Sequence, residues 1–468
     1  MKEISIIGGG ASGTLLVINL IKQYQTGKLT INLIEKDLSR FNRGIAYSTK
    51  DLSHLLNVRV EGMSIFPDEP EHFYNWLLSK DYKLESLDKS SFVSRKIYGD
   101  YLTDNFIKYV NNKNSNIIIN IIQDEVTDVV PSLDKYEIQF LDSKNIKSDI
   151  VILAFGNITE SEINILKYKN VKNYYRSPWT TDFFDEIKST DDILILGSGL
   201  TAIDVITTLH NKKHSGIIYS ISRRGFRPIS HELFSKYPDF SNEFLGKDLN
   251  GIFSIVKKHI KLSKENGYNI RSVIDSMRPY TPKLWKSFSE SDKSRFLRHL
   301  NNMWNSIRHR LPNKTDDIIN NLVSNGQLVF LTGNITEVNE GDILNVKIND
   351  KKFKIDNASI NVNSIINCIG PESNYNKINM PLIKNMLKSS LIENTFNNIS
   401  ITTEDHLILN KGDYSSGNLF GIGPVLKGEF FESTAIPEIR VQAKNLASRI
   451  LKTIHDEQQA GFTREEAC

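Results

Sequence analysis

Cysteine is nearly absent from this sequence, which has only Cys368 and Cys468 in 468 residues. Two cysteines allow no disulfide framework, and the chain has no Cys-x-x-Cys pair of the kind that dithiol oxidoreductases use. This shortage argues against a disulfide reductase. No metal site is expected.

The sequence also lacks long apolar runs and blocks of like charge. No uninterrupted apolar stretch is long enough to span a bilayer, and Met1-Lys2 leads straight into an apolar strand, which leaves no room for a signal peptide. The 58 basic and 55 acidic residues give a net charge of +3 without a strong cluster of either sign. We therefore expect a cytoplasmic protein that binds neither nucleic acid nor membrane.

Length and apolar content, in contrast, are sufficient for more than one core. With 39% hydrophobic and 24% charged residues, the 468-residue chain has the composition of a globular protein of two or three domains. Two glycine-rich fingerprints stand out, Gly8–Gly13 and Gly197–Ala202, each directly after an apolar run. They predict an α/β protein that binds two dinucleotides.

The first fingerprint lies in a complete strand, helix and strand unit. Ile4–Ile7 and Leu29–Glu35 have the apolar character of buried strands, and Thr14–Gln23 has apolar residues at helical spacing. This order of elements is typical of a Rossmann-like βαβ unit.

Each residue of the first loop has a specific part in that prediction. Gly8 permits the tight turn, Gly10 lets the backbone approach a pyrophosphate, and Gly13 lets the helix pack on the strand. Ser12 belongs to the same loop, at the helix N-terminus where amides bind anions. Glu35 ends the second strand, where a carboxylate accepts hydrogen bonds from an unphosphorylated ribose. An unphosphorylated ribose fits FAD or NAD, and an N-terminal unit that is followed by a second one favours FAD.

The second fingerprint differs in the residue that ends its second strand. Gly197 and Gly199 repeat the glycines of the first loop, and Ala202 is small enough for close helix and strand packing. Arg223 and Arg224 stand where an NAD-selective site has an acid. Guanidinium groups suit a 2′-phosphate, so this unit is predicted to bind NADPH rather than NADH.

The order of the elements predicts two nested Rossmann-like domains, the second inserted into the first, with a helical subdomain. We expect the FAD domain at 1–180 and 350–455, and the NADPH domain at 185–349 with a helical insertion at about 240–312. Residues 456–468 are expected to be a mobile tail.

Two later glycines belong to this prediction. The apolar strand Ser364–Cys368 ends on Gly370-Pro371, as an earlier strand ends on Gly156, and this similarity suggests that the first domain has resumed by then. Gly423 lies in a loop similar to the late flavoprotein loop whose amides meet the flavin pyrimidine edge. Gly370 and Gly423 are therefore predicted to bind cofactor; a simple turn is the alternative for Gly423.

Several short motifs follow one another along the chain: Gly44–Thr49, His54–Val58 with Phe73 and Trp76, Arg95 with Tyr98–Tyr101, Trp304 through Arg308–Arg310, and Phe431–Gln442. In this order they resemble the motifs of a bacterial FAD/NAD(P)-binding family. The family includes a flavin-dependent urate hydroxylase and an aspartate N-monooxygenase that makes nitrosuccinate. The resemblance covers nearly the whole chain and implies two nested dinucleotide-binding domains, FAD and a flavin monooxygenase activity. It leaves the substrate open.

The connection after Glu35 would pass near the flavin in such a protein. Gly44 would allow close backbone approach, and Tyr47, His54 or Asn57 would offer hydrogen bonds to the ring or substrate. Each could instead be a satisfied core or loop residue.

No catalytic base is assigned, because His54, His231 and His309 are all suitable by chemistry and all compatible with a structural role. A substrate with carboxylates would need an arginine. Five are candidates: Arg59, Arg95, Arg308, Arg310 and Arg440.

These observations predict a FAD-dependent, NADPH-using monooxygenase that hydroxylates a small nitrogen compound, an amino acid or a purine-like molecule. Molecular oxygen would be the second substrate, through a flavin C4a-hydroperoxide. Two alternatives stay open: an NADPH-dependent flavin reductase or oxidase, and a nonenzymatic nucleotide-binding redox sensor. The substrate and the oligomeric state are not decided by the sequence.

Overall fold

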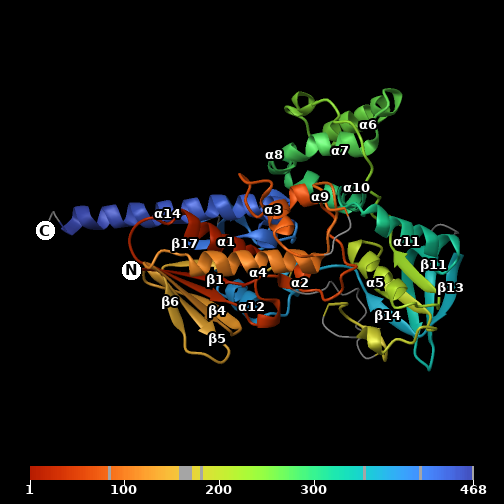
Figure 1. The fold of residues 1–468 in the computed structure, drawn as a ribbon, viewed down its shortest axis with the longest axis horizontal. Coiled ribbons are helices and arrows are strands. Elements are labelled where there is room, and N and C mark those ends of the chain that lie inside the picture. The colour runs from red at the N-terminus through yellow and green to blue at the C-terminus, as the bar shows by residue number, and fades with distance from the viewer. Residues whose placement is uncertain (83–85, 158–170, 180–182, 351–354, 411–413, 466–468) are drawn as a thin grey trace. The chain divides into compact units, whose positions relative to one another are not determined.

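The computed structural model describes residues 1–82, 86–157, 171–179, 183–350, 355–410 and 414–465. The chain divides into two compact units (Figure 1). Unit 1 consists of residues 1–50, 58–158 and 373–468, and unit 2 consists of residues 51–57 and 159–372. Unit 2 is thus inserted into unit 1, and a short early segment of the chain also belongs to it.

Unit 1 is built on a seven-stranded sheet with the order β15-β16-β17-β7-β1-β2-β3. The five strands from β17 to β3 pair in parallel, and β15 and β16 continue the sheet in antiparallel pairing. The central strands β2 and β7 are buried along their whole length, as expected where both faces of a sheet are covered. The strands are β1 (Lys2–Ile7), β2 (Leu29–Ile34), β3 (Ile117–Ile122), β7 (Ile150–Leu153), β15 (Thr403–Glu404), β16 (Leu407–Asn410) and β17 (Tyr414–Gly421).

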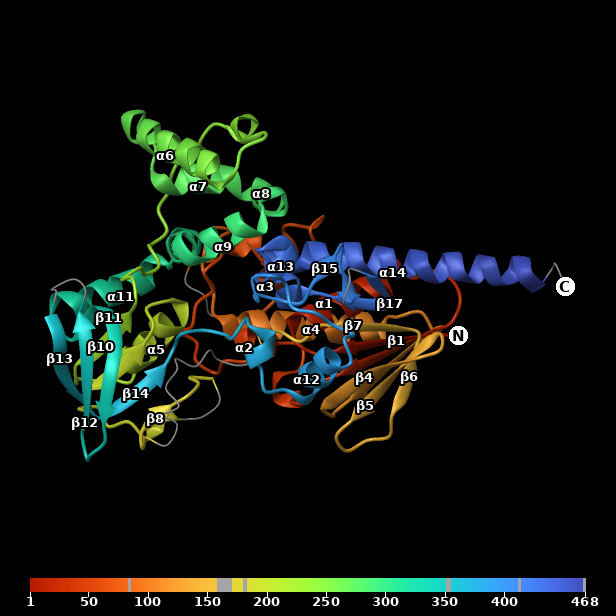
Figure 2. The same ribbon diagram turned by 180° about the vertical axis from the view of Figure 1, so that it is seen from behind.

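Two layers cover this sheet (Figure 2). Helices α1, α4 and α14 form one layer, in which α1 packs against both of the others. Three antiparallel strands and α12 share a hydrophobic core with the other face of the sheet. The elements are α1 (Ala11–Gln23), α2 (Gly44–Tyr47), α3 (His72–Leu78), α4 (Arg95–Asn111), β4 (Val126–Ser132), β5 (Lys135–Phe140), β6 (Ile146–Ser148), α12 (Pro381–Lys388), α13 (Lys427–Phe430) and α14 (Ile436–Glu465).

Unit 2 contains a second seven-stranded sheet with the order β13-β12-β11-β10-β9-β14-β8. Its strand β9 alternates between two cores: Ile193 and Ile195 pack with α5 and α11, while Leu194 and Leu196 pack with β12. The strands are β8 (Tyr174–Tyr175), β9 (Ile193–Leu196), β10 (Ile218–Ser222), β11 (Leu328–Asn339), β12 (Leu344–Asp350), β13 (Ile355–Val362) and β14 (Ser364–Asn367).

The other helices of unit 2 lie mostly between β10 and β11. Two of them, α7 and α10, pack against each other, and α6 packs on α7. The helices α6 to α10 fall within 240–312, the segment for which helical structure was predicted. The helices of unit 2 are α5 (Leu200–Asn211), α6 (Leu249–Glu265), α7 (Ile270–Met277), α8 (Thr281–Ser287), α9 (Glu290–His299), α10 (Asn301–Arg308) and α11 (Asn313–Ser324).

The fold class is as predicted, but the borders of the units differ from the expected ones. Strand β8 pairs with β14 in the second sheet, so unit 2 begins before the expected border at residue 180, which itself lies outside the described residues. Unit 1 resumes at residue 373 rather than near 350. The physical reason is that β13 and β14 complete the second sheet, β14 by parallel pairing with β9.

Residues 456–465, expected to belong to a mobile tail, are helical. Helix α14 continues without a break to Glu465. Residues 451–460 contain no Gly or Pro, and six of the ten are Leu, Lys, Glu, Gln or Ala, which are good helix formers. The mobility of this segment stays a prediction.

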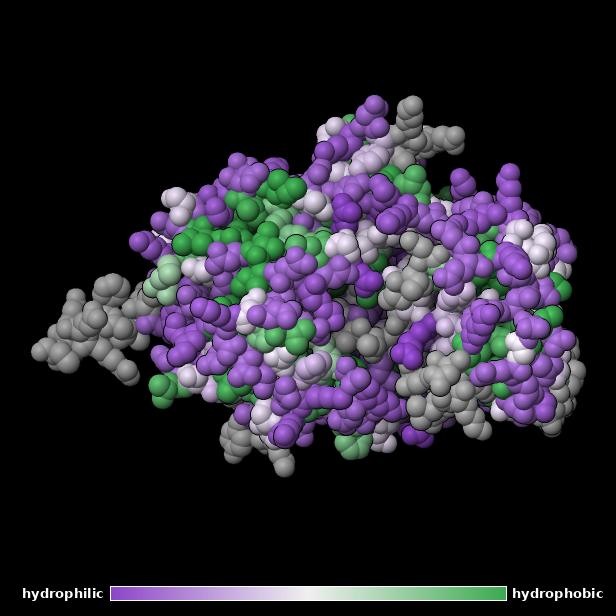
Figure 3. Space-filling view, turned by 90° about the horizontal axis from the view of Figure 1, so that it is seen from below, coloured by the Kyte–Doolittle hydropathy of each residue, from purple (hydrophilic) through white to green (hydrophobic). Residues whose placement is uncertain are grey.

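No helix of the described residues has both the length and the apolar character to cross a bilayer. No three His, Cys, Asp or Glu side chains gather in that part of the chain as a metal site would require. Seen from below, the surface is mostly hydrophilic, with a large group of apolar side chains at upper left and smaller ones elsewhere (Figure 3).

Candidate functional site

The first glycine loop makes a tight turn between β1 and α1. Gly8 has a φ of +115°, and a Cβ there would lie 2.7 Å from the backbone of Ala154 at the end of β7. A Cβ at Gly13 would overlap the carbonyl oxygen of Gly8. Both positions therefore require glycine, and they hold the N-terminus of α1 directly above the strand ends, where a pyrophosphate binds in Rossmann-like folds.

Two glycines from other parts of the chain, Gly44 and Gly423, lie against this loop. A Cβ at Gly10 would lie 3.2 Å from Cα of Gly44, and a Cβ at Gly423 would lie 2.6 Å from Oγ of Ser12. The amide of Gly423 donates to Oε1 of Gln442 over 3.0 Å, which fixes the late loop. Four predicted residues from distant parts of the sequence thus line one end of α1.

Glu35 lies against the same loop. Its Oε2 accepts a hydrogen bond from the amide of Gly9 over 2.9 Å, and its Oε1 accepts one from the amide of Asp37 over 3.0 Å. These bonds hold the carboxylate at the end of β2, beside the glycines, with lone pairs left for ribose hydroxyls. This geometry fits the predicted recognition of an unphosphorylated ribose.

Tyr47 ends α2 and packs on α4. Its ring centroid is 4.9 Å from that of Tyr98. A Cβ at Gly99 would overlap the carbonyl oxygen of Tyr47, so the glycine allows the two helices to approach. Burial raises the pKa of Tyr47 to about 12, with Glu438 also raising it and Arg95 opposing. The phenol is therefore a neutral hydrogen-bond donor at physiological pH.

The second glycine loop repeats the first turn. Gly197 has a φ of +108°, and a Cβ there would lie 2.6 Å from the carbonyl oxygen of Cys368 at the end of β14. The position of a Cβ on Gly199 is open, with no atom of the described residues outside its chain neighbours within 4 Å. Ala202 is fully buried where α5 packs on the sheet. Gly370, predicted to return to the first domain, instead follows β14 in unit 2.

The two arginines after β10 have different surroundings. Both are exposed. Arg224 donates to the carbonyl oxygen of His299 over 2.8 Å and to that of Arg298, at the C-terminus of α9. Arg223 has no hydrogen bond or ion pair within the described residues, so its guanidinium is the one available to an incoming phosphate. A third arginine, Arg227, lies over the ring of Phe330 at 4.7 Å.

The segment 51–57 belongs to unit 2, which places His54 and Asn57 there. Nε2 of His54 is 2.8 Å from Oγ1 of Thr208, and the same hydroxyl donates to Oδ2 of Asp51 over 2.7 Å. The carbonyl oxygen of Asn57 lies 3.1 Å from Nε2 of His231. These contacts anchor the segment on α5 and on the chain after β10. They give His54 and His231 structural partners.

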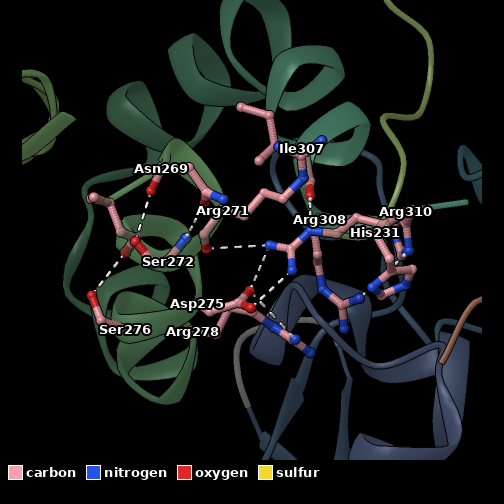
Figure 4. A network of polar contacts seen from close by, with 12 residues as sticks. His231, Asn269, Arg271, Ser272, Asp275, Ser276, Arg278, Ile307, Arg308 and Arg310 are labelled. Carbon is pink, nitrogen blue, oxygen red and sulfur yellow. Dashed lines mark hydrogen bonds and ion pairs between the residues drawn. The ribbon is translucent and has the colours of Figure 1, made fainter. Parts of the chain in front are cut away.

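Two of the five candidate arginines come from the end of α10 (Figure 4). Arg310 is 4% exposed and holds Asp275 with two hydrogen bonds of 2.9 and 2.8 Å. Nearby, Arg271 pairs with Glu232 at 2.9 Å. The Arg310 guanidinium also donates to the carbonyl oxygen of Ile307, so its donors serve the packing of α7 on α10. Arg308 is 8% exposed, and one of its terminal nitrogens lies 3.5 Å from Nδ1 of His309.

The sequence analysis did not single out several residues that shape the first loop. Asn42 has a φ of +64°, its amide donates to the carbonyl oxygen of Gly9 over 2.8 Å, and its Oδ1 accepts from Thr14 over 3.0 Å. Gln442 and Gly99 were noticed only as members of motifs. An asparagine directly before a glycine-containing segment was the available signal for Asn42, since asparagine tolerates positive φ.

Comparison with known proteins agrees with this architecture. The sequence model of a family described as FAD-NAD(P)-binding matches residues 5–158, which contain the first loop and Glu35. No curated protein matches the whole sequence significantly.

Known structures share the fold at low sequence identity. The chain is similar to an ornithine N-hydroxylase of Kutzneria sp. 744 in complex with reduced FAD, NADP+ and L-ornithine, at 12% identity and a TM-score of 0.64, covering 97% of this chain and 99% of that one. It is similar to the FAD-bound cadaverine monooxygenase DfoA of Erwinia amylovora, at 12% identity and 0.62, covering 95% and 92%. It is also similar to the bacillithiol disulfide reductase of Staphylococcus aureus, at 13% identity and 0.55, covering 97% and 99%. The chain therefore shares the fold of these three enzymes.

Proposed function

We propose that unit 1 binds FAD at the first glycine loop. The observation that carries this proposal is the arrangement of bare backbone around the N-terminus of α1, where Gly10 faces Gly44 and Gly423 faces Ser12. A pyrophosphate needs close backbone approach and amide donors, and both are concentrated at this point. Gly8 and Gly13 form the turn, and Glu35 would accept the hydroxyls of the adenosine ribose.

Unit 2 is proposed to bind NADPH. The open space at Gly199 would receive the pyrophosphate above α5, and Arg223 would hold the 2′-phosphate with Arg224 beside it. Gly197 and Ala202 support this loop from below, and Gly370 follows the strand that packs against it.

The reaction proposed is hydroxylation of a small nitrogen compound, an amino acid or a purine-like molecule, with molecular oxygen. Two of the similar structures are of enzymes named for amine hydroxylation. The reductase alternative is favoured by the similarity to a disulfide reductase, but this chain has only Cys368 and Cys468. Monooxygenase chemistry needs no protein thiol, because a bound flavin reduced by the nicotinamide supplies the activation of oxygen.

The side chains of unit 1 would bind and orient the reactants. Burial raises the pKa of Tyr47 to about 12. The phenol is therefore protonated at any physiological pH and can donate a hydrogen bond to a carbonyl or carboxylate oxygen. The surrounding aromatic rings of Phe73, Tyr98 and Tyr101 keep water away from this end of α4.

The experiment is the visible spectrum and the NADPH oxidation rate of the purified protein with a panel of amino acids, diamines and purines. We expect a yellow protein, faster NADPH oxidation with one class of compound, and a product 16 mass units heavier. NADPH-dependent peroxide formation that no compound changes would favour a reductase or oxidase. A protein that stays colourless with added FAD and oxidises no NADPH would favour a redox sensor or binding module.

A further inference from the structure

Two arginines on α14 have opposite surroundings. Arg449 forms an ion pair with Asp405 at 2.6 Å. Arg440, in the second turn of the helix, donates one hydrogen bond of 2.9 Å to the carbonyl oxygen of Ser64 and has no ion pair among the described residues. Its Nε is buried and has no hydrogen-bond partner there. A buried edge of the Arg440 guanidinium is therefore left without an acceptor.

The hydroxyl of Tyr98, in the same unit, is also buried without a hydrogen-bond partner among the described residues. Tyr98 is 0% exposed. Tyr101, one turn further along α4 and equally buried, accepts from the amide of Ile65 over 3.3 Å and lies 2.7 Å from Nδ1 of His72. The fold thus satisfies one buried phenol and leaves its neighbour unsatisfied.

Contacts link these two groups to one place. The rings of Tyr98 and Tyr101 lie 5.4 Å apart. Arg440 is tied to Ser64, and the next residue, Ile65, is tied to Tyr101. The positive charge of Arg440 acts on both phenols, lowering the pKa of Tyr98 and of Tyr101 against the stronger effect of burial.

Two buried donors without an acceptor call for a ligand that brings acceptors. Leaving a buried polar group unsatisfied costs folding free energy. Other buried side-chain atoms of the described residues also lack a partner, but Nε of Arg440 and the hydroxyl of Tyr98 are two donors that the contacts above bring to one place. A guanidinium edge matches a carboxylate in shape and charge, and a phenol adds a third bond. The pyrophosphate of FAD is already accounted for at the N-terminus of α1, which leaves a substrate as the anion.

We propose that Arg440 and Tyr98 form a carboxylate-binding subsite of unit 1, so that the substrate is an amino acid rather than a purine or a simple amine. This inference rests on the proposed function and narrows its substrate class. Of the five candidate arginines, Arg440 has a buried donor without a partner among the described residues. The donors of Arg310, in contrast, are engaged by Asp275 and by the carbonyl oxygens of Ile307 and Arg271.

The test uses the FAD-loaded protein and a binding measurement rather than turnover. Thermal-shift and flavin-absorbance titrations would be done with the twenty common amino acids and L-ornithine, each paired where possible with its amine lacking the carboxylate. We expect at least one amino acid to bind, and its decarboxylated partner to bind at least ten times more weakly. If no amino acid binds at 10 mM, or if the amine binds as well as the acid, the proposal is wrong.

Three variants locate the site. Arg440→Gln should weaken amino acid binding at least tenfold and leave FAD affinity within twofold, Arg440→Lys should restore part of the binding, and Arg449→Gln on the same helix should change neither. Tyr98→Phe should raise the melting temperature of the amino-acid-free protein, because it removes an unsatisfied hydroxyl, and should also weaken amino acid binding. A higher melting temperature with unchanged binding would show a merely structural tyrosine.

The same variants separate failure of this inference from failure of the proposed function. If Arg440→Gln and Tyr98→Phe bind FAD and reduce it with NADPH but amino acids never bind, the carboxylate subsite is wrong and the flavoprotein proposal stands. If Arg440→Gln loses FAD in proportion to amino acid, Arg440 serves the flavin and the subsite is again wrong. A wild-type protein that takes up no FAD would overturn the proposed function itself.

Discussion

The two glycine loops have the same turn but different surroundings. Gly8 and Gly197 have φ angles of +115° and +108°, and each packs on the backbone at the end of a neighbouring strand. The first loop is covered by Gly44 and Gly423, whereas in the part of the chain that the structure describes no atom beyond the chain neighbours lies within 4 Å of the Cβ position of Gly199. The first arrangement suits a cofactor that stays bound, and the second suits one that enters and leaves.

The strand ends after the loops differ in charge. Glu35 is fixed by two backbone amides, while Arg223 is exposed and has no hydrogen bond or ion pair within the described residues. The glycine turn thus determines where a dinucleotide binds, and the residue that ends the second strand determines which dinucleotide is preferred.

The largest effect is expected from substitution of Gly13, the last small residue of the first loop. Gly13→Ala would drive a methyl group into the carbonyl oxygen of Gly8, so we expect FAD affinity to fall about a hundredfold or the protein to lose several kcal/mol of stability. FAD content and melting temperature measure this. Ala202→Gly is the matched control in the second loop, where removal of a methyl group should cost about 1 kcal/mol. Equal losses would contradict the difference between the loops.

The next effect separates two adjacent arginines. Arg223→Ala should raise the KM for NADPH by about 10- to 100-fold, because a charge-assisted hydrogen bond contributes about 1.5–3 kcal/mol, and should leave the KM for NADH unchanged. Arg224→Ala should have a smaller effect on NADPH, since its guanidinium is held by carbonyls at the end of α9. Steady-state kinetics with both nucleotides decides. Equal changes for NADPH and NADH would remove the case for a 2′-phosphate site.

Glu35→Gln should weaken FAD binding about tenfold while leaving NADPH affinity unchanged. The substitution keeps the shape but removes the charge that strengthens hydrogen bonds to the ribose and to the amide of Gly9. Fluorescence titration of the apoprotein with FAD measures the change. Asp37→Asn, in the next turn, serves as a control that should leave FAD affinity within twofold. A loss of NADPH affinity instead would reverse the assignment of the two units.

The smallest effect concerns the late loop of unit 1. Burial lowers the pKa of Lys427, so the folded protein holds this proton less readily than the unfolded chain does. Lys427→Met should therefore raise the melting temperature by about 1–2 °C at pH 7. The gain should shrink as the pH rises through the lowered pKa toward the unfolded value near 10.5, where the charge no longer opposes folding. A gain that grows with pH would contradict this explanation.

Much of this architecture was predictable because the decisive signals are local. The apolar runs of β1, β2 and β9 and the glycines after β1 and β9 identify two βαβ units without any tertiary information. The placement of β14 was not predictable in this way. Its four residues, Ser364–Asn367, are as buried as those of β7, and both strands are followed by a glycine. Which sheet such a strand joins depends on pairing partners far away in the sequence.

The candidate site could also be predicted only in part. The glycines of the first loop and Glu35 were predicted from their spacing, and the structure places them at the N-terminus of α1. Asn57 was grouped with Tyr47 because the two are close in sequence, but the chain passes from unit 1 to unit 2 between them. The buried Nε of Arg440 without a hydrogen-bond partner among the described residues could not be predicted from the sequence either. Whether a donor finds an acceptor depends on which residues the complete fold places beside it.

The insertion of unit 2 has a consequence for the order of biosynthesis. Strand β7 pairs with β1 on one side and with β17, residues 414–421, on the other. Until β17 leaves the ribosome, β7 is an open edge of an unfinished sheet, whereas every strand of unit 2 has been made by residue 367. We therefore expect unit 2 to finish folding before unit 1. The sheet of unit 1 can be completed only after β17 has been synthesised.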